Sequence, residues 1–130
     1  MKPELVYLAW VTLLTALLWL PYILDRLIVR GVPDTVGYPA NPKPQSPWAQ
    51  RLKAAHGNAV ENLVVFAALV LGANALGISN GTIATAALVY FWARVVHVIA
   101  YTLAWPWVRT LAFAVGFAAQ MAVAGQILAH

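Results

Sequence analysis

Residues 46–77 read SPWAQRLKAAHGNAVENLVVFAALVLGANALG, and this stretch decides the fold. Ser46 is typical of a helix N-cap, Pro47 of a first helical position, and Gly77 of a stop just beyond a helix. The helix predicted between them is roughly 45 Å long at about 1.5 Å per residue, which exceeds the roughly 30 Å of hydrocarbon in a bilayer. We therefore expect this helix to span the membrane, with its first turns in the headgroup layer or beyond it.

The composition places the rest of the chain in lipid as well. Of its 130 residues, 62% are hydrophobic and 9% are charged, whereas a soluble domain has about 25% charged residues. The chain is long enough for one domain and contains no cysteine, which excludes a disulfide scaffold, a thiolate metal site and a cysteine nucleophile. The net charge of +4 is spread thinly, so membrane topology explains it better than a nucleic-acid partner does.

Four hydrophobic segments are each close to the roughly 20 residues that a transmembrane helix needs. The first is longer than the apolar core of a signal peptide, and we read it as a retained helix with a kink near Pro21. The later connections are short, so we expect an all-α integral membrane protein, an antiparallel four-transmembrane-helix bundle in one domain of residues 1–130. The expected bounds are about 5–29 for helix 1, 30–46 for a Pro- and Gly-rich loop, 47–76 for helix 2, 80–104 for helix 3 and 106–128 for helix 4.

Basic residues predict the orientation in the membrane. They gather near the first and third loops, which lie on the same side of a four-helix bundle, while the loop between helices 2 and 3 carries no charge. Because cytoplasmic loops carry an excess of Lys and Arg, loops 1 and 3 are expected on the cytoplasmic side and both termini on the opposite side. The basic residues concerned are Arg26, Arg30, Lys43, Arg51, Lys53, Arg94 and Arg109.

Polar side chains inside the predicted spans are costly, so each of them is a candidate for function. At about 100° per residue, Arg51, Asn58 and Asn62 share one narrow stripe of helix 2. Glu61 lies at the edge of this stripe, whereas His56 lies about 140° from Arg51, on another face. Helix 2 therefore presents one polar stripe toward its expected cytoplasmic end.

Helix 3 repeats this arrangement. Its polar stripe covers only about 60° of arc and consists of Tyr90, Arg94, His97 and Tyr101. Arg109 follows in the first turn of helix 4. Together the stripes would build a pocket of cations, amides, phenols and one carboxylate. Such a pocket suits a small zwitterion with more than one carboxylate, because guanidinium groups clamp carboxylates and a lone glutamate pairs with an ammonium.

Other chemistries fit these residues less well. The metal ligands near the pocket would be His56, His97 and Glu61, and His56 does not share the face of Glu61, so no metal is expected. The sequence has no Ser-His-Asp constellation and no glycine-rich phosphate loop. Two alternatives stay open, namely Arg94 and Arg109 as anchors at the membrane boundary, and Glu61 with the amides as hydrogen-bonding contacts between helices.

Three motifs follow one another along the chain, namely Arg51-x4-His56-x-Asn58-x2-Glu61-Asn62, then Arg94-x2-His97-x3-Tyr101, and Arg109-Thr110 after a proline turn. With these motifs the sequence resembles the MAPEG family, the membrane-associated proteins in eicosanoid and glutathione metabolism. It looks like a bacterial-type member similar to the microsomal glutathione transferases. The resemblance covers essentially the whole chain in order, length and helix count.

The resemblance implies a homotrimer of four-helix subunits that binds glutathione, as a co-substrate, between neighbouring subunits in the cytoplasmic half of the membrane. It implies that the catalytic residue is Arg109, which would lie beside the glutathione sulfur and stabilise its thiolate. Glu61 would contact the glutathione ammonium. The other glutathione-binding residues expected are Arg51, Asn58 and Asn62 on helix 2, Arg94, His97 and Tyr101 on helix 3, and Arg26 or Arg30 on helix 1.

The expected function is therefore a membrane glutathione-dependent transferase or peroxidase that acts on hydrophobic electrophiles or lipid hydroperoxides. Ala54 and Gly57 stand where eukaryotic relatives often have arginines, and Phe113 stands where the prostaglandin synthase of the family has a tyrosine. These departures favour glutathione binding over any particular eicosanoid chemistry. The alternatives are a non-catalytic glutathione- or lipid-binding protein of the same fold, and a small multidrug transporter, which would be expected to carry its membrane carboxylate in helix 1.

Overall fold

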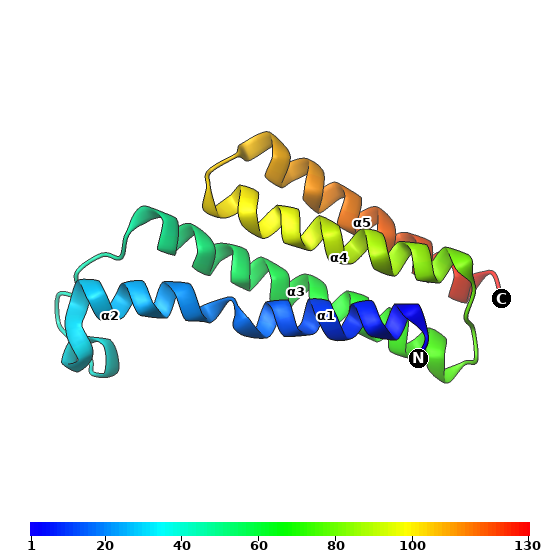
Figure 1. The fold of residues 1–130 in the computed structure, drawn as a ribbon, viewed down its shortest axis with the longest axis horizontal. Helices are drawn as coiled ribbons and strands as arrows, with labels where there is room; N and C mark the ends of the chain where they lie inside the picture. Colours follow the sequence, from blue (N-terminus) through cyan, green and yellow to red (C-terminus); the bar gives the residue numbers. More distant parts are fainter.

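The computed structural model describes residues 1–130 and consists of five helices. They are α1 (Pro3–Leu17), α2 (Trp19–Val36), α3 (Pro47–Ala75), α4 (Gly81–Thr102) and α5 (Pro106–Leu128). Helices α1 and α2 follow each other end to end as one rod, and the other three run beside it (Figure 1). This rod and α3, α4 and α5 are four spans long and apolar enough to cross a membrane. The chain is a multi-pass integral membrane protein, and the expected all-α four-helix bundle is confirmed.

The spans run antiparallel. Both termini and the α3–α4 turn lie at one end of the bundle, here called the terminal end, while residues 37–46 and the α4–α5 turn lie at the other, the loop end (Figure 1). At the terminal end, Ser79 Oγ donates to Oε1 of the buried Glu4 (2.7 Å) and Lys2 Nζ donates to Asn74 Oδ1 (2.9 Å). These bonds hold the N-terminus against the α3–α4 turn.

The kink expected near Pro21 divides α1 from α2 at Leu18. Proline has no backbone N–H, so the carbonyl of Leu17, four residues earlier, has no helical partner. Just before the proline, the N–H of Leu18 bonds to the carbonyl of Thr15, three residues earlier (3.4 Å). The turn here is therefore tighter than in an α-helix. The Thr15 hydroxyl donates to the carbonyl of Val11 (2.8 Å). The break therefore lies about one turn before the proline that causes it.

Helix α2 continues beyond the expected end of the first helix. The expected loop begins at residue 30, whereas α2 reaches Val36. Gly31 interrupts the helix with a φ of 78°, a left-handed conformation that glycine adopts without steric cost. One more turn then forms, and the N–H of Gly37 closes it on the carbonyl of Pro33 (2.8 Å). The irregular loop is therefore shorter than expected and comprises residues 37–46.

The end of this loop is fastened to α2 through Asp25. Ser46 occupies the expected N-cap position of α3, but its side chain does not cap the helix. The Ser46 hydroxyl donates to Asp25 Oδ1 (2.5 Å), and its backbone N–H donates to Asp25 Oδ2 (3.0 Å). Asp25 is buried, and a buried carboxylate without partners is costly. The need to satisfy this carboxylate therefore sets where α3 begins relative to α2.

Small and aromatic residues bring the helices together around Arg94. Gly116 of α5 faces α4, where a Cβ on this glycine would lie 3.8 Å from Ala93 Cβ and 3.9 Å from Arg94 Cδ. Small residues at such positions let helix backbones approach closely in a membrane. Between α3 and α4, the rings of Phe66 and Tyr90 stack with centroids 3.9 Å apart and an interplanar angle of 7°. Gly116 therefore lets the backbone of α5 approach the Arg94 side chain closely.

We expect Gly116→Leu to destabilise the bundle by about 1–3 kcal/mol, the usual cost of overpacking a filled interior. Gly116→Ala should be nearly neutral, because one added Cβ makes only ordinary contacts with Ala93, Arg94 and Tyr90. Gly125→Leu is the matched control, since it lies on the same helix and an added Cβ there meets nothing within 4 Å. Thermal unfolding in mild detergent measures all three. Equal unfolding midpoints for the two leucine variants would contradict the close approach of α5 to α4.

Candidate functional site

A buried arginine forms the centre of a polar cluster inside the bundle. Arg94 on α4 is only 2% exposed. Its Nη2 donates to Oδ1 of Asn58 on α3 (2.8 Å) and lies 3.3 Å from Nδ1 of His97, one turn along α4. Because a guanidinium group only donates, His97 Nδ1 accepts this bond and the neutral imidazole carries its proton on Nε2. Arg94 therefore orients both an amide and an imidazole.

The cluster reaches α5 through a second amide on α3. Asn62 Nδ2 donates to the carbonyl (2.9 Å) and to Oδ1 (3.2 Å) of Asn58. Gln120 Nε2 on α5 donates to the carbonyl of Asn62 (3.1 Å). Gln120 is 3% exposed, and it was not among the expected site residues. A signal for it exists in the sequence, since it is the sole polar side chain between Thr110 and Gln126 in an apolar span.

A hollow of about 280 Å³ opens beside this cluster, toward the loop end. Over it the guanidinium of Arg109 rests on an aromatic ring, with Cζ 4.7 Å from the centroid of Tyr101, a distance typical of cation–π contact. The Tyr101 and His97 rings meet edge-on, with centroids 5.6 Å apart. The lining comes from α3, α4 and α5 and consists of Asn58, His97, Tyr101, Arg109, Thr110 and Phe113. The interior cluster thus supports Arg109 through two rings.

A second hollow of about 190 Å³ shares Tyr101 and Arg109 with the first and adds Arg51 from α3. Arg51 Nε donates to the carbonyl of Thr102, the last residue of α4 (2.9 Å), which leaves the Nη groups for a ligand. Arg109 lies in the first turn of α5, which begins at Pro106. The free N–H groups and the dipole of a helix N-terminus favour an anion. Two guanidinium groups and the first turn of α5 therefore border one space.

The charge around the two hollows is unbalanced. Arg51 and Arg109 line them, Arg94 lies behind them, and no Asp or Glu is among the lining residues. In surroundings of low dielectric, cations without a nearby carboxylate strongly favour an anionic ligand. No group of three or more His, Asp or Glu side chains is placed to hold a metal ion. The arrangement can therefore bind carboxylates and stabilise a developing negative charge.

The other expected site residues lie outside the two hollows. Glu61 is exposed on α3. Arg26 is half-buried, and its buried Nε has no hydrogen-bond partner. Arg30 donates from Nε to the carbonyl of Lys43 in the loop (2.7 Å). The structure therefore gathers the polar stripes of α3 and α4 with Arg109, but it does not add Glu61 or the two arginines of α2.

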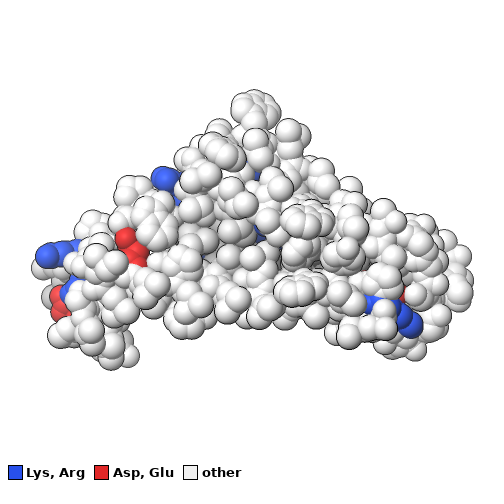
Figure 2. Space-filling model, viewed as in Figure 1, with Lys and Arg blue, Asp and Glu red and all other residues white.

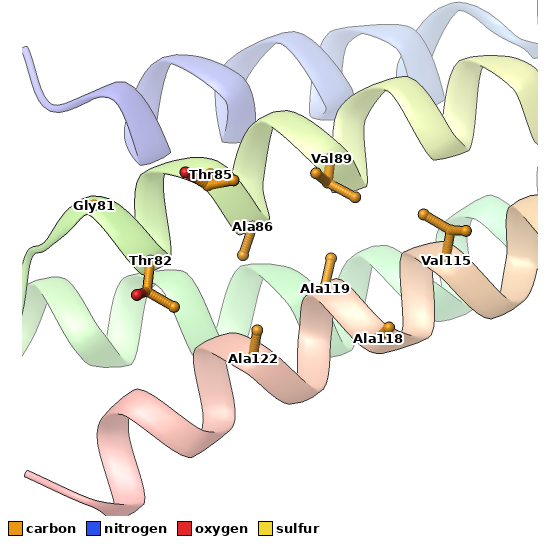
Figure 3. A pocket seen from close by; sticks show the side chains of 9 residues that line it. All are labelled: Gly81, Thr82, Thr85, Ala86, Val89, Val115, Ala118, Ala119 and Ala122. Atoms are coloured by element: carbon orange, nitrogen blue, oxygen red, sulfur yellow. The ribbon is translucent and has the colours of Figure 1, made fainter.

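The largest hollow of the structure lies elsewhere. It measures about 770 Å³ and runs between α4 and α5, where Figure 3 shows small side chains such as Ala86 and Ala119 pointing into it. Thr82 and Thr85 are its polar side chains, and no charged residue lines it. On the face of the molecule shown in Figure 2, the charged side chains lie mainly toward the two ends of the bundle. The largest hollow is therefore not one of the two that charged side chains line.

Comparison with known proteins places the chain in a family. A family model described as the MAPEG family matches residues 7–129. Searches of curated proteins and of solved structures found no match. The family match covers nearly the whole chain, including every residue that lines the two hollows around Arg109. The chain therefore belongs to the MAPEG family.

Proposed function

We propose that the protein is an integral-membrane, glutathione-dependent transferase or peroxidase that acts on hydrophobic electrophiles or lipid hydroperoxides. Membership of the MAPEG family supports a glutathione-related function at family level. The observation that carries the proposal is the position of Arg109, which rests on Tyr101, lines both hollows and lies in the first turn of α5. A cation there is suited to stabilise the thiolate of bound glutathione.

The charges of glutathione match those of the site. Its two carboxylates need cations, and Arg51 and Arg109 line one hollow together. Asn58 and His97 line the other hollow and offer hydrogen bonds to the peptide groups of glutathione. Arg94 lines neither hollow but bonds both of these side chains, so we assign it a positioning role. Tyr101 shares both hollows with Arg109 and holds its guanidinium group.

Neighbouring copies of the chain complete the site in the proposed homotrimer. Glu61 lies at the midpoint of α3 (Pro47–Ala75), yet it is exposed. A carboxylate that faces lipid at such a depth is costly. A neighbouring subunit that packs its hollows against α3 would shield Glu61 and allow it to pair with the glutathione ammonium. The same packing would provide a partner for the unpaired Nε of Arg26.

The proposed chemistry requires a thiolate. A free thiol has a pKa near about 8.5, so most glutathione is protonated at neutral pH without help. In the transfer reaction the thiolate sulfur attacks an electrophilic carbon, a C–S bond forms and the leaving group departs with its electron pair. In the peroxidase reaction sulfur attacks a hydroperoxide oxygen, the O–O bond breaks and an alcohol leaves, and a second glutathione then gives the disulfide and water. Arg109 stabilises the attacking thiolate in both reactions.

A glutathione- or lipid-binding protein without catalysis is the second candidate. Phe113 lines the hollow beside Arg109 and offers no hydrogen-bond donor. Ala54 and Gly57 supply no cation from α3. In either case we propose that the loop end lies on the cytoplasmic side, because basic residues gather there. The enzyme is expected to form the thiolate of bound glutathione and the binding protein is not, so thiolate formation distinguishes the two candidates.

We expect Arg109→Leu to keep the fold and much of the glutathione affinity but to abolish the ultraviolet absorbance of bound thiolate. Conjugation should slow by about a hundredfold, as when one group that stabilises developing negative charge is removed. Arg109→Lys should retain part of both signals, because the charge survives while the planar group is lost. Stopped-flow absorbance on mixing with glutathione makes the measurement. The same thiolate signal in Arg109→Leu as in the parent would assign Arg109 to anchoring.

We expect Glu61→Gln to weaken glutathione binding by about ten- to a hundredfold, since a hydrogen bond to a charged group contributes about 1.5–3 kcal/mol. Asp34→Asn is the matched control, because it also removes one exposed carboxylate but lies at the end of α2. Equilibrium binding of glutathione to the purified oligomer measures both affinities. Unchanged affinity in Glu61→Gln would exclude the proposed contact with the ammonium.

A further inference from the structure

A third polar hollow lies at the loop end, apart from the site around Arg109. It measures about 390 Å³, and apart from Pro44 its wall consists of charged and amide side chains. The wall is built from the end of α2, the loop and the first two turns of α3, and consists of Arg30, Pro44, Gln45, Gln50 and Lys53. None of these residues lines the two hollows around Arg109. The proposed glutathione chemistry therefore leaves this hollow unused.

Hydrogen bonds between segments hold the wall in place. Arg30 Nε donates to the carbonyl of Lys43 (2.7 Å), which fixes the guanidinium and leaves its two Nη groups for a ligand. Gln50 Nε2 donates to the carbonyl of Gln45 (2.7 Å) and joins α3 to the loop. Gln45 Nε2 in turn donates to the carbonyl of Tyr22 on α2 (2.7 Å). A ligand would therefore enter a preformed hollow, and preformed sites lose less free energy to ordering.

The charge of the hollow is positive. Arg30 and Lys53 line it, and no carboxylate does. The carboxylate of Asp25 lies 3.4 Å from Gln45 Nε2, but it is 6% exposed and accepts both bonds from Ser46. Asp25 is therefore engaged behind the wall, where it holds the loop. A guanidinium, an ammonium and polar amides around one space suit a compact anion with several acceptor oxygens, such as a phosphate group.

The depth of the hollow indicates where such a phosphate would come from. Helix α3 has 29 residues, which make it roughly 43 Å long at about 1.5 Å per residue, against roughly 30 Å of hydrocarbon. Lys53 lies in the second turn of α3, and Arg30 lies near the end of the span Pro3–Val36. We therefore expect both at the depth of the lipid headgroups, where phosphate is present at high local concentration.

We propose that this hollow binds the phosphate of an anionic phospholipid headgroup. Arg30 contacts the phosphate through its Nη groups, Lys53 contributes the second charge, and Gln50 lines the hollow beside them. The bound lipid links α2, the loop and α3 at the same end as the Arg109 site. It therefore stabilises the loop end of the bundle without sharing a residue with the two hollows around Arg109.

The test is a thermal unfolding titration of the whole protein in detergent micelles with rising mole fractions of phosphatidylglycerol. Lys53→Gln should raise the half-saturating mole fraction about fivefold, and Arg30→Gln with Lys53→Gln about 25-fold, the effect of one and two basic residues at an anionic lipid surface. Lys43→Gln is the matched control, since it removes the same charge from the same loop while its side chain lies outside the hollow. It should titrate like the parent.

Two further titrations, with other ligands, identify the ligand of the hollow. Phosphatidylcholine, a zwitterion with the same phosphate, should stabilise the protein far less than phosphatidylglycerol, and inorganic phosphate should have no effect at millimolar concentration. Stabilisation by inorganic phosphate that Lys53→Gln removes would overturn the lipid assignment and make the hollow a site for free anions. A parent-like titration of Lys53→Gln, or an equal loss in Lys43→Gln, would overturn the site itself. Each of these outcomes is independent of glutathione binding.

Discussion

The hydrogen bond from Arg94 to Asn58 is the interaction on which the interior of the bundle depends. A guanidinium group that is 2% exposed inside a membrane protein needs partners, and this one takes an amide from the neighbouring helix α3. Asn62 and Gln120 extend the same network to α5. Gly116 lets the α5 backbone pass close to the arginine stem. Satisfying one buried charge thus fixes three helices relative to one another.

The two arginines at the centre of the site have different roles because their surroundings differ. Arg94 is buried and its bonds are directed inward, so it orients His97 and holds Asn58 at the wall of the hollow. Arg109 lines both hollows and is supported by the ring of Tyr101. The short α4–α5 turn is what places Arg109 beside the polar stripe of α4. A rigid interior charge therefore positions a second charge that remains accessible to a ligand.

Helical periodicity predicts the features that depend on a single helix. The spans follow from runs of apolar residues, and the shared face of Arg94 and its neighbours follows from 3.6 residues per turn. Contacts between segments do not follow from periodicity. Gln120 belongs to the polar cluster because it donates to a carbonyl of a helix distant in the sequence. The Ser46 hydroxyl donates to buried Asp25 and does not cap α3. In the proposed homotrimer a neighbouring copy would cover the exposed Glu61, and a contact between copies does not follow from the periodicity of one helix.

Calorimetric titration of the detergent-purified protein with glutathione and with S-hexylglutathione tests whether the cationic hollows around Arg109 bind glutathione. We expect saturable binding of both ligands, with the conjugate bound more tightly because its hexyl chain buries apolar surface at the lipid edge of the site. Both ligands should compete for the same sites. If folded protein with native helical content shows no saturable heat with either ligand, the hollows around Arg109 do not bind glutathione.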